Sequence, residues 1–295
     1  MRRVAAMMFG LSAAVGCAAG ASAYDASGDR LFPTTLLLPQ IAPGDEFYLN
    51  ANTLPQTNGA TRTSNLTATY MKTITDNLGI EIEENWTAIG QSGAGTNYGW
   101  QNLDGELKYL AVNNTDHEFL LALGLDRETG GTGAARVGAF ASGATTPRVY
   151  FAKGLGDLDI GYLRPLAVEG YGGVQFADTA PRPDQTQGGL VFEYSIPYLQ
   201  SEVRSFDLPD WLRRLTPMTE ITFTIPAGRS YGERATTLIG PGVSYAGEGW
   251  EFAVEALVPN TRATGAGIGV TAQLHFSLDF LFAGSIVGKP LFSNQ

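Results

Sequence analysis

The sequence predicts an all-β protein, a transmembrane antiparallel up-and-down β-barrel of about 12 strands with a short periplasmic helix. Apolar and polar residues alternate along many segments, and several of these segments reach ten or more residues, which is long enough to cross a bilayer at a tilt. After the N-terminus no apolar run is long enough for a membrane-spanning helix. The 37 glycines and the 16% of charged residues also suit strands and turns better than a helical enzyme.

The first 23 residues read as a cleavable secretory signal peptide. Arg2 and Arg3 precede an apolar run from Val4 to about Gly20, and Ala21-Ser22-Ala23 forms a small-residue cleavage site. We therefore expect export to the outer membrane of a Gram-negative cell. The alternative is lipidation of Cys17, because Ala14-Val15-Gly16-Cys17 is a passable lipobox, although Leu is usual where Ala14 stands.

Charge and cysteine usage exclude several classes of protein. Removal of residues 1–23 takes away two arginines and no acid from a chain with 19 basic and 29 acidic residues, so the expected mature charge is −12. An acidic exported chain is a poor nucleic-acid binder. Without Cys17, and with only His117 and His275, we expect no disulfide, no transition-metal site and no cofactor.

Twelve segments carry the strand pattern. The clearest is the last, in which Val270, Leu274 and Phe280 share one face while Gln273 and Asp279 lie on the other. We predict a periplasmic N-terminal segment over 24–44, a barrel over 45–282 and a periplasmic C-terminal tail over 283–295. The predicted strands are 47–52, 62–75, 80–89, 98–113, 117–126, 147–153, 163–177, 188–199, 219–226, 235–245, 250–259 and 265–282.

An even strand count places both termini on the periplasmic side and assigns every connection. The tight turns at 76–79, 113–116 and 246–249 become periplasmic, as tight turns should be. The longer loops become extracellular. One long periplasmic connection, 200–218, contains Asp207–Leu215, where Asp207 would cap a short amphipathic helix.

The polar face of the strands distinguishes a membrane barrel from a soluble β-sandwich. It carries Asn, Gln, Thr, Ser and acids with little lysine, which is typical of a lumen lining. Two residues fit badly, since Glu84 and Lys72 fall among apolar outward positions; a β-bulge or a snorkelling lysine would accommodate them. The predicted lumen-lining residues are Glu81, Glu83, Asp104, Glu106, Lys108, Glu118, Arg148, Lys153, Glu193, Glu220, Glu251, Glu255, His275 and Asp279.

Five stretches in the second half of the chain resemble the outer-membrane transporter family named after the MetA pathway of phenol degradation. They span residues 151–158, 162–168, 193–199, 208–217 and 272–276. The resemblance covers roughly residues 145–292. It implies an outer-membrane barrel that moves small, hydrophobic or aromatic compounds, and it supplies no catalytic residues.

Three functions follow, with a channel or transporter for small solutes as the first. Its expected partners are outer-membrane lipid, the barrel-assembly machinery and the solute. The second is a lipid hydrolase, since His275, Ser277 and Asp279 share a strand face as in outer-membrane phospholipase A; Ser230 in Gly228–Gly232 matches a nucleophile elbow but no helix follows it. The third is a non-conducting binding or structural barrel, expected if Leu31–Ile41 or residues 128–146 fill the lumen.

Overall fold

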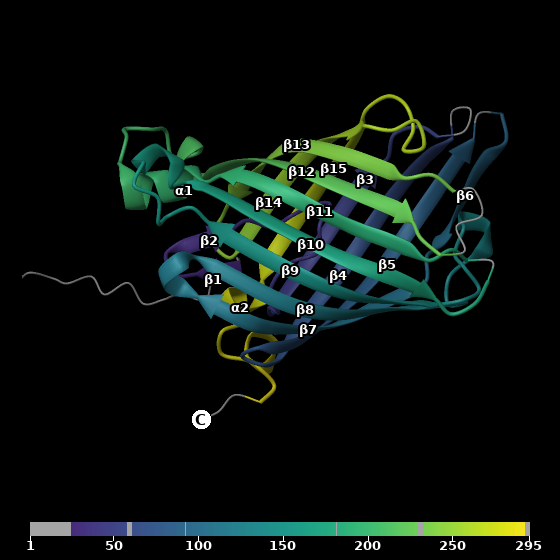
Figure 1. The fold of residues 1–295 in the computed structure, drawn as a ribbon, viewed down its shortest axis with the longest axis horizontal. Coiled ribbons are helices and arrows are strands. Elements are labelled where there is room, and N and C mark those ends of the chain that lie inside the picture. Colours follow the sequence, from purple (N-terminus) through teal and green to yellow (C-terminus); the bar gives the residue numbers. More distant parts are fainter. Residues whose placement is uncertain (1–24, 58–60, 92, 181, 229–232, 293–295) are drawn as a thin grey trace, which may run out of the picture.

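The computed structural model describes residues 25–57, 61–91, 93–180, 182–228 and 233–292, and these form one closed antiparallel β-barrel of 12 strands (Figure 1). The predicted fold class is confirmed. The predicted signal peptide with Cys17, and Ser230, lie outside the described residues.

The barrel wall follows chain order, and the pairing of its first strand, β3, with its last, β15, closes it. Strands β6 and β7 both pair with β5 and act as one strand interrupted at Gln101 and Asn102. The strands are β3 (Glu46–Thr53), β4 (Arg62–Thr75), β5 (Leu78–Gln91), β6 (Gly95–Trp100), β7 (Leu103–Asn114), β8 (Phe119–Thr129), β9 (Ala144–Gly154), β10 (Leu166–Ala177), β11 (Gln185–Tyr194), β12 (Leu215–Pro226), β13 (Thr236–Ala246), β14 (Trp250–Pro259) and β15 (Gly269–Ser277).

Two strands end earlier than predicted, and a serine N-cap ends each of them. Strand β11 stops at Tyr194 because Ser195 accepts a hydrogen bond from the Tyr198 amide (3.2 Å) and starts α1 (Ile196–Tyr198), which continues as a π-turn over Leu199–Val203. Strand β15 stops at Ser277, which caps α2 (Leu278–Leu281) in the same way. The helix predicted at Asp207–Leu215 is reduced to a 3-10 turn, Leu212–Arg214.

The start of β15 also differs from the prediction. Gly265 and Gly267 have φ angles of 125° and 77°, a backbone region that strands do not use. The strand therefore begins at Gly269. The remaining short elements are 3-10 turns at Thr115–His117, Ala135–Val137, Gly161–Leu163 and Ile286–Gly288.

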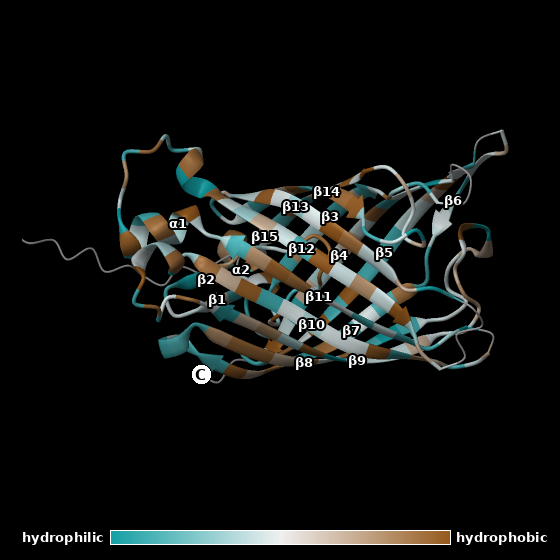
Figure 2. Cartoon of the chain, turned by 45° about the horizontal axis from the view of Figure 1, so that its top comes forward, coloured by the Kyte–Doolittle hydropathy of each residue, from teal (hydrophilic) through white to brown (hydrophobic). Residues whose placement is uncertain are grey.

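Apolar side chains cover the outside of the barrel, as a lipid-facing wall requires. Leu107, Leu123, Leu125, Val149 and Phe192 are all exposed, while their strand neighbours of opposite parity face the interior and are buried or half-buried. The hydrophobic residues appear in Figure 2 as brown bands along the strands. Among the described residues, no helix is long and apolar enough to cross a membrane.

Lys72 and Glu84, the two charged residues predicted among outward apolar positions, have different surroundings in the structure. Lys72 lies outward but is buried, because its Nζ forms an ion pair with Asp45 (2.5 Å) and a hydrogen bond to the Lys289 carbonyl. The amides of Leu291 and Phe292 bond to the end of β4, so the C-terminal tail covers this lysine. Glu84 stays on the outward face opposite Ala68, and the β4–β5 register shifts at Thr73–Thr75, away from Glu84.

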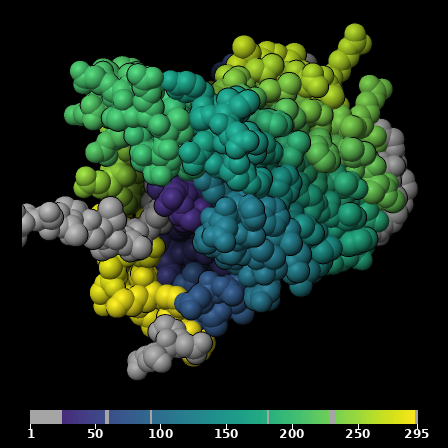
Figure 3. Space-filling view, turned by 60° about the vertical axis from the view of Figure 1, so that its left-hand side comes forward, coloured from purple at the N-terminus to yellow at the C-terminus, as the bar shows by residue number. Residues whose placement is uncertain are grey.

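The N-terminal segment that we predicted to be periplasmic lies inside the barrel. Strands β1 (Asp25–Ser27) and β2 (Arg30–Phe32) form a hairpin, and residues 33–45 continue along the inner wall before β3 begins. Figure 3 shows the purple N-terminal atoms seated in the opening at one end of the barrel. We call residues 25–45 the plug, the end of the barrel where residues 25 and 292 lie the terminal end, and the opposite end the loop end.

The lumen as a candidate functional site

A row of polar side chains crosses the inner wall. Tyr48 on β3 is in register with Thr69 on β4, Thr69 with Glu83 on β5, and Glu83 with Asp104 on β7. The row continues through His275 to Glu251 on one side and to Glu128 on the other. Because barrel strands are tilted, this row climbs from Glu251 at the terminal end to Glu128 at the loop end.

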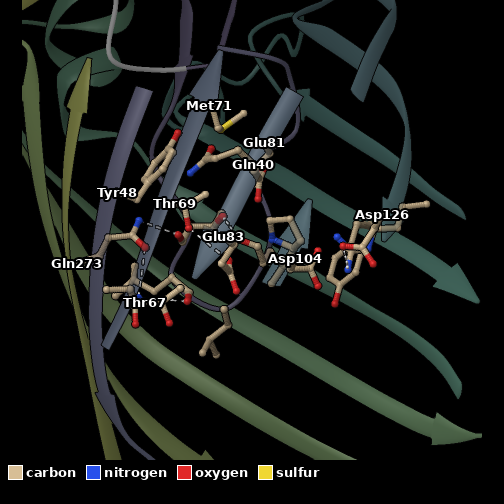
Figure 4. Close-up of a pocket in the computed structure, with 18 of the residues that line it drawn as sticks. Gln40, Tyr48, Thr67, Thr69, Met71, Glu81, Glu83, Asp104, Asp126 and Gln273 are labelled. Atoms are coloured by element: carbon tan, nitrogen blue, oxygen red, sulfur yellow. Dashed lines mark hydrogen bonds and ion pairs between the residues drawn. The ribbon is translucent and has the colours of Figure 1, made fainter. Parts of the chain in front are cut away.

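Two cavities lie inside the wall between the plug and the loop end. The larger, about 290 Å³, has Leu36, Leu37 and Leu38 of the plug on one side and wall residues of β3, β4, β5, β7, β8, β9, β10 and β15 around it (Figure 4). The second, about 220 Å³, lies under Gly138, Phe140 and Arg182 of the loops. Glu83 and Asp104 line both cavities and so mark their junction.

Two basic residues balance some of the acids of the larger cavity. Lys108 Nζ lies 3.2 Å from Glu81, and its other bond goes to the Gln40 carbonyl of the plug (2.6 Å). Arg148 binds Glu106 and Asp126, each at 3.1 Å. No ion pair of Glu83 or Asp104 is found among the residues that the structure describes.

Loop residues narrow the loop end of the lumen. Arg182 forms an ion pair with Glu128 and stacks over the Phe140 ring at 4.5 Å, and Asn102 donates to the Phe140 carbonyl (2.8 Å). Outside the lumen, Arg127 binds Asp178 through two hydrogen bonds of 2.7 and 2.6 Å, and these hold the pKa of Asp178 below its ordinary value.

Wall acids hold the plug by accepting hydrogen bonds from its backbone. Glu220 accepts from the amides of Leu36 (2.7 Å), Leu37 (2.9 Å) and Leu38 (3.1 Å). Glu251 accepts from Thr34 (3.2 Å). These backbone groups have no sheet partner of their own, and a buried amide without an acceptor costs about 1–3 kcal/mol. The carboxylates therefore serve as the plug's hydrogen-bonding partners.

Arg30 fixes the start of the plug at the terminal end. Its side chain is fully buried, with Nε 3.2 Å from Glu118 and Nη1 3.1 Å from the Pro165 carbonyl, and it stacks over the Tyr198 ring at 3.8 Å. The Tyr198 hydroxyl donates to Glu118 (2.6 Å). Burial and this hydrogen bond raise the pKa of Tyr198, which lies in α1 outside the barrel strands, to about 12.

Apolar contacts complete the seat of the plug. Phe32 and Ile41 pack on Leu120, Ala122 and Tyr150 of the wall. Leu38 packs on Val191 and Met218. Small inward residues leave room for the chain, and Gly240 lies so close that an added Cβ would come within 2.9 Å of Leu37.

Twelve of the fourteen predicted lumen residues lie on the inner wall or at its inner rim. These are Glu81, Glu83, Asp104, Glu106, Lys108, Glu118, Arg148, Glu193, Glu220, Glu251, Glu255 and His275. The carboxylates of Glu193 and Glu255, and of Glu169, which sequence reasoning missed, have no hydrogen-bond partner among the described residues.

Lys153 and Asp279 were predicted to line the lumen, but the structure places both elsewhere. In β9, Tyr150 and Ala152 are the inward residues, so Lys153 points outward and pairs with Asp157 (3.0 Å) in the following turn, where its hydrogen bond lowers the pKa of Asp157. Asp279 lies in α2 at the rim, because β15 ends two residues before it, and it bonds with Ser277.

Sequence reasoning also missed Asp126 and the plug's own polar residues, Asp25 and Arg30. Asp126 was the last residue of a predicted strand and carried no second signal. Asp25 accepts from the amides of Ile41 (2.9 Å) and Ala42 (3.0 Å), contacts that appear only once the plug is folded. Alternation cannot reveal partners within an irregular segment.

The geometry does not assemble the hydrolase that His275 and Ser277 suggested. His275 is buried between Glu46 (3.4 Å) and Glu251 (4.0 Å) and stacks on Tyr48 at 4.3 Å. Ser277 instead caps α2. Within the part of the chain that the structure describes, no group of three or more His, Cys, Asp or Glu residues is arranged to hold a metal ion.

Comparison with solved structures supports the architecture. The COG4313 outer membrane channel from Pseudomonas putida F1 superposes with a TM-score of 0.51 at 12% sequence identity, over 84% of this chain and 99% of the channel. The fold is that of an outer-membrane β-barrel. The KdgM porin matches less well, with a TM-score of 0.47 at 12% identity over 79% of this chain and 98% of the porin. No family model matches the sequence, and no curated protein does.

Proposed function

We propose that this protein is an outer-membrane channel for small solutes and that its own plug holds it closed in the conformation described. The observation that carries the proposal is the pair of polar cavities that begins under the loops and ends on the plug. A barrel with an apolar outside and a polar, partly hollow inside is suited to passage and not to packing.

Displacement of the plug is the step that would open the channel. The wall is a closed ladder of strand pairs that does not include residues 25–45, so the plug can leave without breaking the wall. Its contacts are individually modest, since a hydrogen bond to a charged group contributes about 1.5–3 kcal/mol. Opening therefore requires that several such contacts, together with the apolar packing of Phe32, Leu38 and Ile41, are released at once.

We also propose a chemical class for the solute. The resemblance to the phenol-degradation transporters favours hydrophobic or aromatic compounds, and the larger cavity offers Leu36, Leu37, Met71 and Tyr171 as apolar surface. The apolar outer band would contact membrane lipid, and insertion would require the barrel-assembly machinery of the outer membrane.

Solute flux into liposomes that contain the purified protein tests this function. A channel admits small sugars, amino acids or aromatic acids faster than liposomes without protein do, and it produces discrete conductance steps in planar bilayers. Absence of both from the protein with and without its plug would reject the channel.

The second candidate, a non-conducting binding barrel, is favoured by one observation, namely the filled terminal half of the lumen. The same flux experiment separates the two functions, because a binding barrel stays impermeable when the plug is removed. Among the residues that the structure describes, no contact favours the hydrolase.

A further inference from the structure

We infer that Glu83 and Asp104 bind the ammonium group of a small organic cation at the junction of the two cavities. This inference rests on the proposed channel function, because a solute that passes through the lumen would meet this junction. It adds the chemical class of the solute to that function.

The two carboxylates form an uncompensated cross-strand pair. Glu83 and Asp104 are direct partners in the β5–β7 register, and like charges placed opposite each other in a sheet are destabilising. The neighbouring acids Glu81 and Asp126 have Lys108 and Arg148, whereas no cation lies within ion-pair distance of Glu83 or Asp104 among the described residues. The pair thus lacks a positive charge that a ligand can supply.

A second feature of the same cavity points to a ligand. Tyr48 is only 4% exposed, yet its hydroxyl has no hydrogen-bond partner among the described residues. It lines the larger cavity in the same row as Thr69 and Glu83, and Figure 4 shows Tyr48, Thr69, Glu83 and Asp104 following one another along the wall. A buried hydroxyl is normally paired, so a bound polar group is the simplest partner for it.

The other side of the cavity suits an apolar body attached to the ammonium group. Leu36, Leu37 and Leu38 of the plug and Met71 of β4 line it, and its volume of about 290 Å³ is near the lower limit of ordinary small-molecule sites. An amine whose ring or short alkyl chain carries a hydroxyl group at the end away from the ammonium therefore matches the cavity in size and chemistry, because that hydroxyl can pair with Tyr48.

Charge argues against an anion in this position. Arg148 is the basic residue of the cavity lining, and it already binds both Glu106 and Asp126. An anion would therefore face four carboxylates with no free basic partner in the lining. A cation replaces repulsion between Glu83 and Asp104 with attraction to both.

Binding of 2-(4-hydroxyphenyl)ethylamine to the purified full-length protein in detergent, measured by isothermal titration calorimetry, tests the site. The amine should bind, while 2-(4-hydroxyphenyl)ethanol and 4-hydroxyphenylacetate, which share the ring and its hydroxyl group, should bind at least about tenfold more weakly. The double variant Glu83→Gln/Asp104→Asn should lose amine affinity by about tenfold or more. The matched variant Asp76→Asn/Asp116→Asn removes two exposed turn acids and should bind as the wild type does.

Equal affinity for the alcohol, no binding of the amine to the wild type, or unchanged binding in the lumen variant would each overturn the site. Retention of the heat-modifiable electrophoretic shift shows that each variant is folded. The flux assay is independent of this result: conductance without amine binding rejects the site and leaves the channel, whereas amine binding without any conductance rejects the channel and leaves the site.

Discussion

At the scale of single residues, the acids of the lumen have two roles. Glu220 and Glu251 bind backbone amides of the plug, whereas Glu83 and Asp104 line both cavities, and Glu83 accepts a hydrogen bond from Thr69 (3.3 Å). Sequence alternation predicted that all four point inward, because strand parity is a local property. It could not separate the roles, since the partners of Glu220 lie more than 180 residues away in an irregular segment.

Glu220→Ala should loosen the plug. The substitution leaves three amides of the plug without an acceptor, and each costs about 1–3 kcal/mol when buried. We expect the fraction of time in the open state to rise by tenfold or more in planar-bilayer recordings. Asp116→Asn, in an exposed turn, is the control, and a Glu220→Ala channel that opens no more often than this control would contradict the assignment.

Arg30→Met should weaken the plug at its other anchor. Methionine keeps much of the side-chain volume but leaves Glu118 and the Pro165 carbonyl without their buried donor. Limited proteolysis measures the effect: residues 25–45 should become cleavable while the barrel stays intact. A plug as resistant to protease as that of the wild type would argue against Arg30 as an anchor.

At the scale of elements, pattern reasoning located the strands of the barrel wall but missed the β1–β2 hairpin and the folding of the irregular segments. All twelve predicted strands exist, because alternation over ten residues is a strong signal. Their ends depended on single groups, such as the caps at Ser195 and Ser277, that end a strand against its continuing alternation. Lys153 was misplaced because it and Arg148 have opposite parity on β9, so only one of them can face the lumen.

The position of the plug could not be read from alternation at all. Residues 33–45 contain three prolines and no regular period, so the sequence marks them only as irregular. Their place is set by inward glycines, carboxylates and apolar side chains that come from many strands. This binding surface for the plug exists only after the barrel closes.

Gly240→Val should displace the plug through steric contact. A Cβ at residue 240 would lie 2.9 Å from Leu37 Cδ1 and closer still to the Glu255 carboxylate, so a larger side chain leaves too little room for the plug. Gly172→Val is the matched control, because a Cβ at that strand position meets nothing within 4 Å. Bilayer conductance should increase for Gly240→Val alone, and equal conductance in both variants would contradict the close packing of the plug.

At the scale of the whole molecule, the barrel is inverted relative to a soluble protein. Its apolar residues face outward and its acids are buried, an arrangement that is stable only when lipid surrounds the wall. The scarcity of lysine on the polar strand faces predicted that these faces line the lumen. The even strand count is a separate argument. It predicted which connections share an end of the barrel, because the connections of an antiparallel barrel alternate between its two ends.

Leu123→Arg tests the lipid-facing wall. Leu123 is 48% exposed near the middle of β8, and an arginine at the bilayer midplane costs about 2–4 kcal/mol. Urea unfolding in lipid vesicles should show that loss, and Leu123→Ile should show little change. A stability unaffected by the arginine would place this face away from the membrane core.

The central claim is that the lumen is a passage closed by residues 25–45. Planar-bilayer recordings of the full protein beside a variant that lacks those residues test it most directly, once the heat-modifiable shift has shown that both barrels are folded. The variant should give larger and steadier conductance steps than the full protein, because the wall is complete without the plug. A folded variant that conducts no better than the full protein would contradict the claim.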